Sequence, residues 1–506
     1  MPEDGFPTKA APVHAAPIHM APASSARRAL VLAACLMATF MAAVESSIVA
    51  TAMPTIVADL GGFHLFSWVF AIYLLTQAVS IPVYGRLADI YGRKKVFYVG
   101  AGLFLIGSTL CGFAGNMATL ILFRALQGFG AGGVQPIATT ILGDIYTPTE
   151  RAHVQGLVSS VFGVSAVLGP SLGAFLVEQV SWQFVFWVNL PIGVAAIAMI
   201  ATFLNESVQH RRHRIDYLGS LLLMLTVAAL MVVLVQGASL PRTALLTVGV
   251  TGVAMLVALA LHELRTPEPM LPLELWRQHR IILVGSLGGA TISALMMGIS
   301  AFLPTYVQGA MGRSALAGGL VLGVMSVTWA LASFFGGRLM VRTTYRLTAV
   351  LGTLALIIGS AVLITLTPER GVPWAVCGSL LIGVGMGLCN TTFIVSVQAA
   401  VPWQQRGAAT SSVMFLRFVG QSLGAASFGA VLNLTLLHQA PEMAHMVDQL
   451  LDPVQRSGLA PGDLARLTEV VAAGLHNTYV LGGALAVVAL GLALTLPAKL
   501  SPRSRG

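Results

Sequence analysis

Residues 85–96 read GRLADIYGRKKV, a polar stretch that includes three consecutive basic residues. Apolar runs flank it at about residues 64–84 and 96–114, and each is long enough to cross a hydrocarbon core of about 30 Å as a helix. Gly85 and Gly92 permit a tight turn between the two runs, because glycine adopts backbone conformations that other residues avoid. The stretch therefore predicts a turn at a membrane surface between two spanning helices.

The same alternation of apolar runs and short polar segments extends along the chain. Of its 506 residues, 56% are hydrophobic and 9% are charged, against about 25% charged in ordinary globular domains. The runs are too long and too uniform for the strands of a membrane barrel, which alternate over about 10 residues. We therefore expect an all-α membrane protein with fourteen transmembrane helices. The expected spans are residues 29–53, 64–84, 96–114, 117–142, 154–177, 183–204, 217–236, 243–262, 281–304, 315–336, 347–366, 373–398, 409–432 and 475–496.

The distribution of basic residues predicts the orientation, because Lys and Arg are retained on the cytoplasmic side. With a cytoplasmic N-terminus, the cytoplasmic segments hold 21 of the 28 Lys and Arg residues, the opposite segments hold five, and the spans hold two. Both termini are therefore expected in the cytoplasm, with the protein in the cytoplasmic (inner) membrane. The net charge of +9 follows from this topology and requires no nucleic-acid partner.

Several other classes of protein are disfavoured. The four cysteines lie in apolar spans without CxxC spacing, so neither a disulfide framework nor a zinc site is indicated. No Walker-type GxxxxGK[ST], HExxH or GxSxG motif is found, so we expect neither an enzyme nor a nucleotide as energy source. Residues 1–26 are rich in Pro, Ala and His and are expected to form a disordered cytoplasmic tail, and residues 499–506 a second short tail.

Two local matches indicate an internal duplication. GRLADI at residues 85–90 reappears as GRLMVR at 337–342, and GPSLGA at 169–174 reappears as GQSLGA at 420–425, at offsets of 252 and 251. Spans one to six would then correspond to spans nine to fourteen. Two six-helix halves of this kind are typical of transporters that work by alternating access, with the binding site near the membrane midplane. The expected units are residues 27–205, a linker with two additional helices at 206–278, and residues 279–498.

Six ordered motifs resemble the major facilitator superfamily and, within it, the drug/proton antiporters with fourteen spanning helices. GRLADIYGRKKV resembles the superfamily's signature loop between spans two and three. The other motifs are LILFRALQGFGAGG (120–133), VLGPSLGAFL (167–176), WQFVFWVNLPIG (182–193), RIDYLGSLLL (214–223) and RFVGQSLGAASFG (417–429). The resemblance implies export of small lipophilic compounds, cationic ones among them, driven by the proton gradient and without a cofactor. Its expected partners are the substrates, protons, membrane lipid and, as a further candidate, a periplasmic adaptor protein.

The resemblance also assigns roles to two of the motifs. Gly85, Asp89, Gly92 and Arg93 would form a conformational latch, in which an Asp89–Arg93 contact exists in one state only. The alternative is that the basic residues of this loop only anchor the topology. Gly169, Pro170 and Gly173 would form the bent, tightly packed helix that marks antiporters, and the alternative is ordinary helix packing through small residues.

Charged residues inside the spans are the strongest functional candidates, because each costs about 2.5–3.5 kcal/mol to insert at the centre of the membrane. Glu45 in VESSIVATAMP is the clearest acid, where the resembled family usually has Asp, and Arg124 and Arg417 are the clearest bases. The resemblance places Glu45 and Arg124 on cavity-lining spans, so a contact between them that changes with conformation would couple motion to proton uptake or release. Gln127 belongs to the same span-four motif as Arg124. A static buried ion pair remains the alternative.

Arg417 has no acidic counterpart that can be identified from the sequence, so structural and functional interpretations both stay open. The longest extracytoplasmic segment, residues 433–474, predicts a short amphipathic helix followed by another from Pro461. These helices would gate the outer mouth, contact an adaptor or lie at the membrane surface. Two other functions remain open as well: export of one dedicated metabolite or siderophore, and a non-transporting membrane sensor or receptor.

Overall fold

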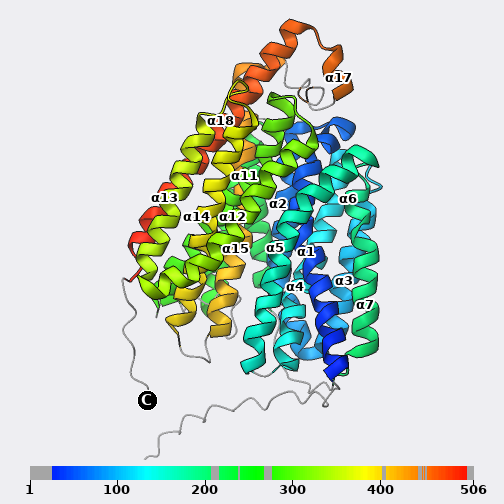
Figure 1. The fold of residues 1–506 in the computed structure, drawn as a ribbon, viewed down its shortest axis with the longest axis vertical. Coiled ribbons are helices and arrows are strands. Elements are labelled where there is room, and N and C mark those ends of the chain that lie inside the picture. The colour runs from blue at the N-terminus through cyan, green and yellow to red at the C-terminus, as the bar shows by residue number, and fades with distance from the viewer. Residues whose placement is uncertain are drawn as a thin grey trace, which may run out of the picture.

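The computed structural model describes residues 25–146, 148–206, 216–236, 240–266, 276–277, 279–401, 406–442, 447, 450 and 453–497. Within these ranges every regular element is helical (Figure 1). Most of the expected tail at residues 1–26, and all of that at 499–506, lie outside the described residues.

A helix lies at each of the fourteen expected spans, and in the described part of the chain twelve helices are long and apolar enough to cross a membrane. The apolar part of α8, Leu218–Leu234, is shorter than the others. The elements are α1 (Ser25–Leu60), η1 (Phe63–Leu65), α2 (Phe66–Tyr91), α3 (Arg93–Cys111), α4 (Met117–Ile145), α5 (Pro148–Gln179), α6 (Phe184–Trp187), α7 (Asn189–Phe203), α8 (Tyr217–Gln236), α9 (Arg242–Arg265), α11 (Arg280–Thr305), η2 (Tyr306–Ala310), α12 (Ala315–Arg342), α13 (Tyr345–Ile364), α14 (Gly371–Ala399), α15 (Arg406–Gln439), α17 (Pro453–Gly458) and α18 (Pro461–Leu494).

The helices before α8 and those after α9 have the same pattern of neighbours. In the first helix group, α1–α7, α4 packs against α2 and α3, and α1 packs against α5 and α7. In the second helix group, α11–α18, α14 packs against α12 and α13, and α11 packs against α15 and α18. The two groups meet where α5 contacts α12, α2 contacts α15 and α1 contacts α11.

Glycine contacts show that this similarity extends to individual residues. Gly128 of α4 packs against α2. A Cβ atom at this position would lie only 2.3 Å from Thr76 Oγ1, so a larger residue has no room. Gly383 of α14 lies equally close to Thr328 of α12, and Thr328 is 252 positions after Thr76. This is the offset found between the sequence repeats, so the duplication is visible in the packing as well as in the sequence.

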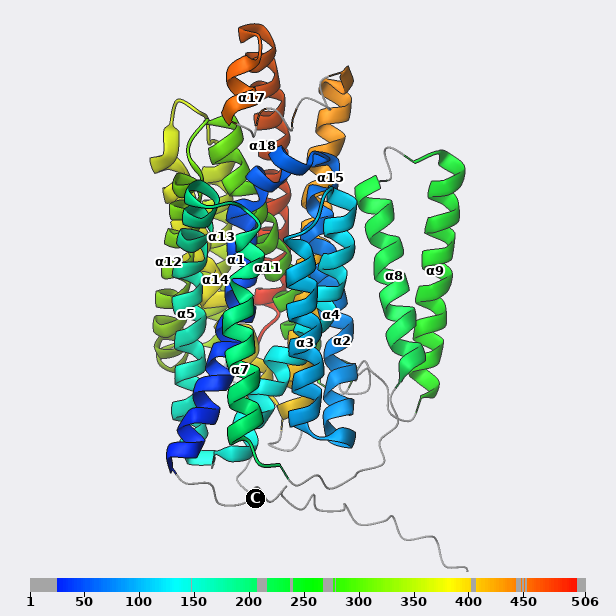
Figure 2. The same ribbon diagram turned by 90° about the vertical axis from the view of Figure 1, so that its right-hand side faces the viewer.

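The inserted helices α8 and α9 form a pair at the side of the two groups (Figure 2). In the described part of the chain α8 packs on the groups, through α2 and α15, while α9 packs on α8. Asp216 joins the start of α8 to the last turn of α9, because its Oδ1 lies 2.7 Å from His262 Nε2 and also accepts a hydrogen bond from Gly219 N at 2.8 Å. The pair is therefore held together at one end by a partly buried polar contact.

The two ends of the molecule differ. At one end, called here the α17 end, α17 and the first turns of α18 extend beyond the other helices (Figures 1 and 2). The opposite end, where α1 begins and α18 ends, is called the basic end. It carries Arg27, Arg28, Arg93, Lys94 and Lys95.

The helix expected from Pro461 is present, but it is not a separate helix. α18 continues without a break from Pro461 to Leu494, about 51 Å at 1.5 Å per residue. Proline suits the first turn of a helix, where its missing N–H is not needed, and no further proline interrupts the run. The other helix expected in this segment falls mostly on residues outside the described part of the chain.

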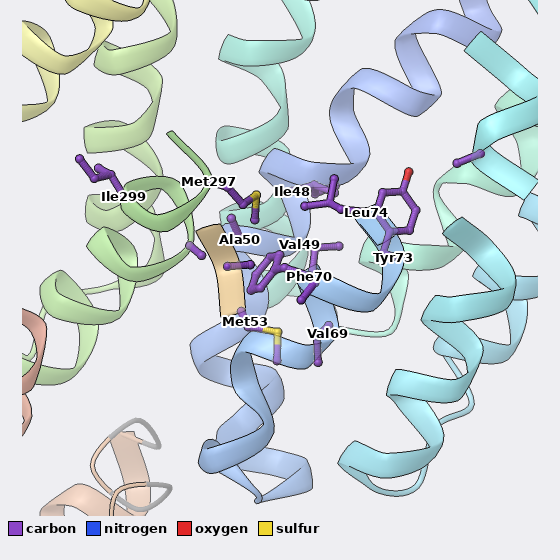
Figure 3. Packing of buried hydrophobic residues seen from close by; sticks show 14 of the residues in the cluster. Ile48, Val49, Ala50, Met53, Val69, Phe70, Tyr73, Leu74, Met297 and Ile299 are labelled. Carbon is purple, nitrogen blue, oxygen red and sulfur yellow. The ribbon is translucent and has the colours of Figure 1, made fainter. Parts of the chain in front are cut away.

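The two helix groups are in direct contact toward the α17 end. Phe66 of α2 and Phe302 of α11 lie with their ring centroids 4.9 Å apart. Figure 3 shows the hydrophobic packing of α1, α2 and α11, with Met297 beside Ala50. Hydrogen bonds that cross between the groups run from Gln308 Nε2 to Thr51 O (3.3 Å), from Leu316 N to Glu178 Oε1 (2.9 Å), from Ser422 Oγ to Ala71 O (2.9 Å) and from Asn433 Nδ2 to His64 O (2.9 Å).

Candidate functional site

Glu45 and Arg124 form an ion pair in the interior of the first helix group. Arg124 Nη1, from α4, donates to Glu45 Oε1, from α1. The two side chains are 0% and 1% exposed, so the pair is sealed from solvent in this conformation. A buried pair of this kind is tolerated only when further hydrogen bonds satisfy the remaining polar atoms.

Asn189 satisfies the second oxygen of the carboxylate. Its Nδ2 donates to Glu45 Oε2 at 2.6 Å and to Ser108 Oγ at 3.1 Å. Asn189 is the first residue of α7, and the break between α6 and α7 at Val188 places it at the depth of Glu45. The sequence did not single out Asn189, although an amide at position 189 in the otherwise apolar WQFVFWVNLPIG was an available signal.

The guanidinium of Arg124 has partners on α4 and α2. Nη1 donates to Gln127 Oε1 at 2.7 Å, Nε donates to Val69 O at 3.1 Å, and the guanidinium lies 4.0 Å from the centroid of the Tyr73 ring. Gln127, a candidate from the sequence, thus contacts the pair directly. Val69 and Tyr73 were not predicted, because a backbone carbonyl and a ring face give no signal in a sequence.

Ser108 of α3 completes this network. Its hydroxyl donates to Phe186 O at 2.8 Å and accepts from Gln127 Nε2 at 3.1 Å, besides the bond from Asn189. Five hydrogen-bonding or charged side chains from α1, α3, α4 and α7 are therefore joined into one enclosed cluster, defined here as the Glu45 network: Glu45, Ser108, Arg124, Gln127 and Asn189.

The Glu45 network touches the contact between the helix groups through α2. Val69 and Tyr73 of α2 contact Arg124, and Ala71, which lies between them, accepts the hydrogen bond from Ser422 of α15. One helical turn of α2 therefore has the ion pair on one side and the second helix group on the other.

The predicted antiporter motif also lies at the contact between the groups. Gly169 packs against Ser47 of α1 and Gly173 packs against Ile48, in both cases too closely for a Cβ atom without movement. The carbonyl of Pro170 lies beside Gly319 of α12. α5 therefore sits tightly between α1 of its own group and α12 of the other.

The loop at residues 85–96 is shorter than expected. α2 continues to Tyr91, so Gly85 is helical and only Gly92, with φ of 93°, turns the chain into α3. The reason is that residues 86–91 contain neither glycine nor proline, so nothing in them ends the helix.

Arg93 has partners that the sequence did not suggest. Its Nε lies 3.1 Å from Asp144 Oδ2 at the end of α4, and its backbone N–H donates to Glu206 Oε1 at 2.7 Å. Glu206 also accepts from Lys94 N at 2.9 Å, so this carboxylate caps the N-terminus of α3. The side chain of Asp89 lies outside the described part of the structure, and the predicted Asp89–Arg93 contact stays a prediction.

Arg417 is placed apart from these residues, on α15 in the second helix group. Its stem packs against Gly289 of α11, and its Nη1 lies 3.5 Å from Met414 Sδ. Within the part of the chain that the structure describes, its buried Nε has no hydrogen-bond partner.

The described residues contain no group of three His, Cys, Asp or Glu side chains that could hold a metal ion. The four cysteines are free, and Cys35, Cys111 and Cys389 are buried.

The fold and the enclosed ion pair define a multi-pass helical membrane protein with charges kept inside its bundle. The chain belongs to the Major Facilitator Superfamily, whose family model matches residues 35–425. It is therefore a membrane transporter rather than an enzyme.

Three relatives by sequence illustrate the range of the family. Multidrug resistance protein 3 of Bacillus subtilis (strain 168) is 34% identical over 399 residues, which cover 78% of each chain. Multidrug transporter protein MdtP of the same strain is 33% identical over 413 residues, 80% of this chain and 76% of that protein. The Acurin A biosynthesis cluster MFS-type transporter of Aspergillus aculeatus is 31% identical over 416 residues, 80% of this chain and 75% of that protein.

Solved structures share the fold. A bacterial homologue of the human lysosomal transporter Spinster, in an inward-facing and unoccupied conformation, matches with a TM-score of 0.68 at 17% identity, over 93% of this chain and 97% of that chain. A D-xylose-proton symporter matches with a TM-score of 0.64 at 13% identity, over 93% and 98% of the two chains. At such identities the likeness concerns the fold alone.

Proposed function

We propose that this chain is a proton-coupled antiporter that exports lipophilic drugs or toxic compounds across the cytoplasmic membrane by alternating access. The export of drugs is supported by the two Bacillus subtilis relatives, which are named as multidrug resistance and multidrug transporter proteins and match about four fifths of this chain. The proton gradient supplies the energy, and no cofactor takes part.

In the proposed topology all fourteen long helices cross the membrane, and both termini are cytoplasmic. The basic end faces the cytoplasm because it carries the clusters of Lys and Arg that are retained there. Residues 27–205 and 279–498 form the two moving halves, and residues 206–278 add the helix pair α8 and α9. Membrane lipid surrounds the outward-facing leucines of the helices, such as Leu246, which is 67% exposed.

Glu45 is the proposed proton carrier. The main support for this role is the position of the Glu45 network beside the contact between the helix groups. A proton on Glu45 removes its negative charge and thereby weakens the attraction to Arg124. Arg124 also holds Val69 and Tyr73 of α2, so a change in the pair alters the same helical turn that bonds to Ser422 of α15. Protonation and the relative position of the halves are linked in this way.

Alternating access requires that the contacts at the α17 end break as contacts at the basic end form. Among the described residues, hydrogen bonds that cross between the groups lie beside close contacts of small side chains, for example at Gly319 and Gly429. The carboxylate in these bonds, that of Glu178, is exposed to solvent, so the contacts can separate without leaving this charge buried and unpaired. The Arg93–Asp144 pair serves as the proposed latch at the basic end, and α17 with the start of α18 offers a surface for a periplasmic adaptor.

The test is substrate-induced proton release from proteoliposomes that contain the purified chain. Wild type is expected to release protons when substrate is added, and Glu45→Gln, which keeps the shape but cannot change charge, is expected to bind substrate without releasing protons. Asp59→Asn is the matched control, because Asp59 lies on the same helix but bonds to Trp182 Nε1 at 2.7 Å near the α17 end. Unchanged pH-driven transport in Glu45→Gln would contradict the coupling role.

A second candidate is the export of one dedicated metabolite on the same fold. The Aspergillus aculeatus relative favours it, because that protein is named for a biosynthesis cluster. Transport of several unrelated lipophilic compounds by the purified chain would exclude this candidate, and strict preference for one compound would support it.

A further inference from the structure

Arg417 lies deep in the membrane-spanning part of the second helix group. It is the twelfth residue of α15, about 16 Å from the start of this helix at 1.5 Å per residue. Ser422 bonds to Ala71 of the antiparallel α2, which puts Arg417 near the level of residue 76, close to the middle of the candidate membrane span Phe63–Gly85. A guanidinium at this depth is costly unless it has a partner.

The described neighbours of α15 offer no acid at this depth. α8, α11 and α14 contain no Asp or Glu, and α18 carries Asp463 and Glu469 near the α17 end. Gly474 packs against Leu432 of α15, which is 15 residues or about 22 Å from Arg417, and Glu469 lies further still toward the α17 end.

α2 carries one acid, Asp89, at the other end of the molecule. Ser422 of α15 bonds to Ala71 of α2, and the two helices run in opposite directions. Asp89 is 18 residues beyond Ala71 and Arg417 is five residues before Ser422, so about 20 Å separates their levels along the helices. Glu45, in the other helix group, is already bonded to Arg124 and Asn189.

The local contacts leave the guanidinium ready to accept an external partner. Gly289 gives space for the stem, Met414 provides only a sulfur contact at 3.5 Å, and the buried Nε has no hydrogen-bond partner among the described residues. Arg417 as a whole residue is only partly buried. A planar fork of N–H donors of this kind binds carboxylate and phosphate groups with two parallel hydrogen bonds.

We propose that Arg417 binds the anionic group of a transported lipophilic molecule, with a carboxylate as the preferred chemistry. The inference rests on the proposed function, since it names the class of substrate that the exporter takes. The depth of Arg417 favours a substrate over a lipid headgroup, whose phosphate stays at the membrane surface. The sealed Glu45 network agrees with this assignment, because its only carboxylate is not available to attract a cation in this conformation.

The experiment compares tetramethylrhodamine, which has a free carboxylate, with its methyl ester, in which an added methyl group removes the negative charge and the cationic ring system is kept. Binding of each dye to the purified full chain in phosphatidylcholine nanodiscs is followed by fluorescence anisotropy. Arg417→Gln is expected to weaken binding of the free acid about tenfold and to leave binding of the ester nearly unchanged. Arg417→Lys retains the charge without the planar fork. Its affinity for the free acid is expected to lie between those of wild type and Arg417→Gln. Arg338→Gln, which removes an arginine stacked 4.0 Å from the Phe334 ring, is the control and should change neither.

Binding of the ester reports that each variant is folded, so a loss of both dyes in Arg417→Gln would overturn the inference by showing a structural role. Equal affinity of wild type for acid and ester would overturn it as well. Competition by phosphatidylglycerol that disappears in Arg417→Gln would assign Arg417 to a lipid headgroup instead. Arg417-dependent binding of the acid without proton-linked transport would support the inference while contradicting the proposed antiport, so the two failures are distinguishable.

Discussion

The two helix groups share a packing framework but differ in where they keep charge. Gly173 packs on Ile48 as Gly424 packs on Ala294, which places Thr291 of α11 at the position of Glu45. The glycine contacts of α4 and α14 place Ser379 at the position of Arg124. The ion pair of the first group is thus replaced by two hydroxyl residues in the second.

At Arg417 the second helix group has a charge that the first group lacks. The sequence repeat between α5 and α15 places Ala166 at this position in the first group. One group therefore contains a buried pair whose charges satisfy each other, and the other contains a single guanidinium without an acid among its described neighbours. Helix packing and charge are therefore separable: small residues fix how the helices approach, while a few substitutions decide what each half can bind.

The sharpest test of this contrast is to remove the two arginines in turn. Arg124→Gln leaves Glu45 as a buried charge without its counter-ion, and we expect it to lower the free energy of unfolding by about 3–5 kcal/mol. Arg417→Gln removes a costly charge that has no described partner, and we expect the free energy of unfolding to stay unchanged or to rise. Thermal unfolding of the purified variants in detergent measures both.

The double variant Glu45→Gln/Arg124→Gln checks the physical reason. Because it leaves no uncompensated charge, it should recover a large part of the stability that Arg124→Gln loses. A double variant as unstable as Arg124→Gln alone would show that the cost arises from lost packing, for instance against Tyr73, and not from the orphaned carboxylate.

Two corresponding serines, Ser108 and Ser360, also differ between the groups. Ser108 joins three partners in the Glu45 network, whereas Ser360, 252 positions later, has a buried hydroxyl without a hydrogen-bond partner among the described residues. Ser108→Ala leaves buried polar groups unsatisfied and should cost about 1–3 kcal/mol, while Ser360→Ala should be neutral or slightly stabilising. The same unfolding measurement applies, and equal effects at the two positions would contradict the network.

Much of this arrangement could be predicted from the sequence. Apolar runs of about 20 residues located the helices, because a spanning helix must satisfy its backbone internally and be apolar over its length. Charges are so scarce in the spans that Glu45 and Arg124 were the obvious candidates for contact, and the structure brings them together. The offset of 252 holds for Thr76 and Thr328 of α2 and α12, whereas Glu45 and Thr291 are 246 positions apart and Arg124 and Ser379 are 255 apart, because the connecting segments differ in length.

The rest of the site depended on helix rotation and on contacts distant in sequence. Ser108 and Asn189 are two among many polar residues in the spans, and only the rotation of α3 and α7 decides which of them face Glu45. The contact between Asp144 and Arg93 bridges 51 positions. The extent of α2 through Gly85 was also missed, because glycine permits a turn without requiring one.

The smallest expected effect concerns the proposed latch, which is also unequal between the groups. The ion pair of Arg93 and Asp144 corresponds to Tyr345 and Ala399 in the second group, so only the first group can have it. Both side chains are partly exposed, at 12% and 23%, and a double-mutant cycle with Arg93→Gln and Asp144→Asn should give a coupling of about 0.2–1 kcal/mol.

A low value is what a working latch requires, because a contact made in one conformation biases the equilibrium by its own free energy. A coupling near 0.5 kcal/mol favours one state about twofold, which lets the halves exchange during each cycle. Each single variant should therefore change the transport rate, measured in the same proteoliposomes, while its unfolding temperature stays nearly the same. A coupling of several kcal/mol, with transport and stability falling together, would instead make the pair a permanent tie between α3 and α4.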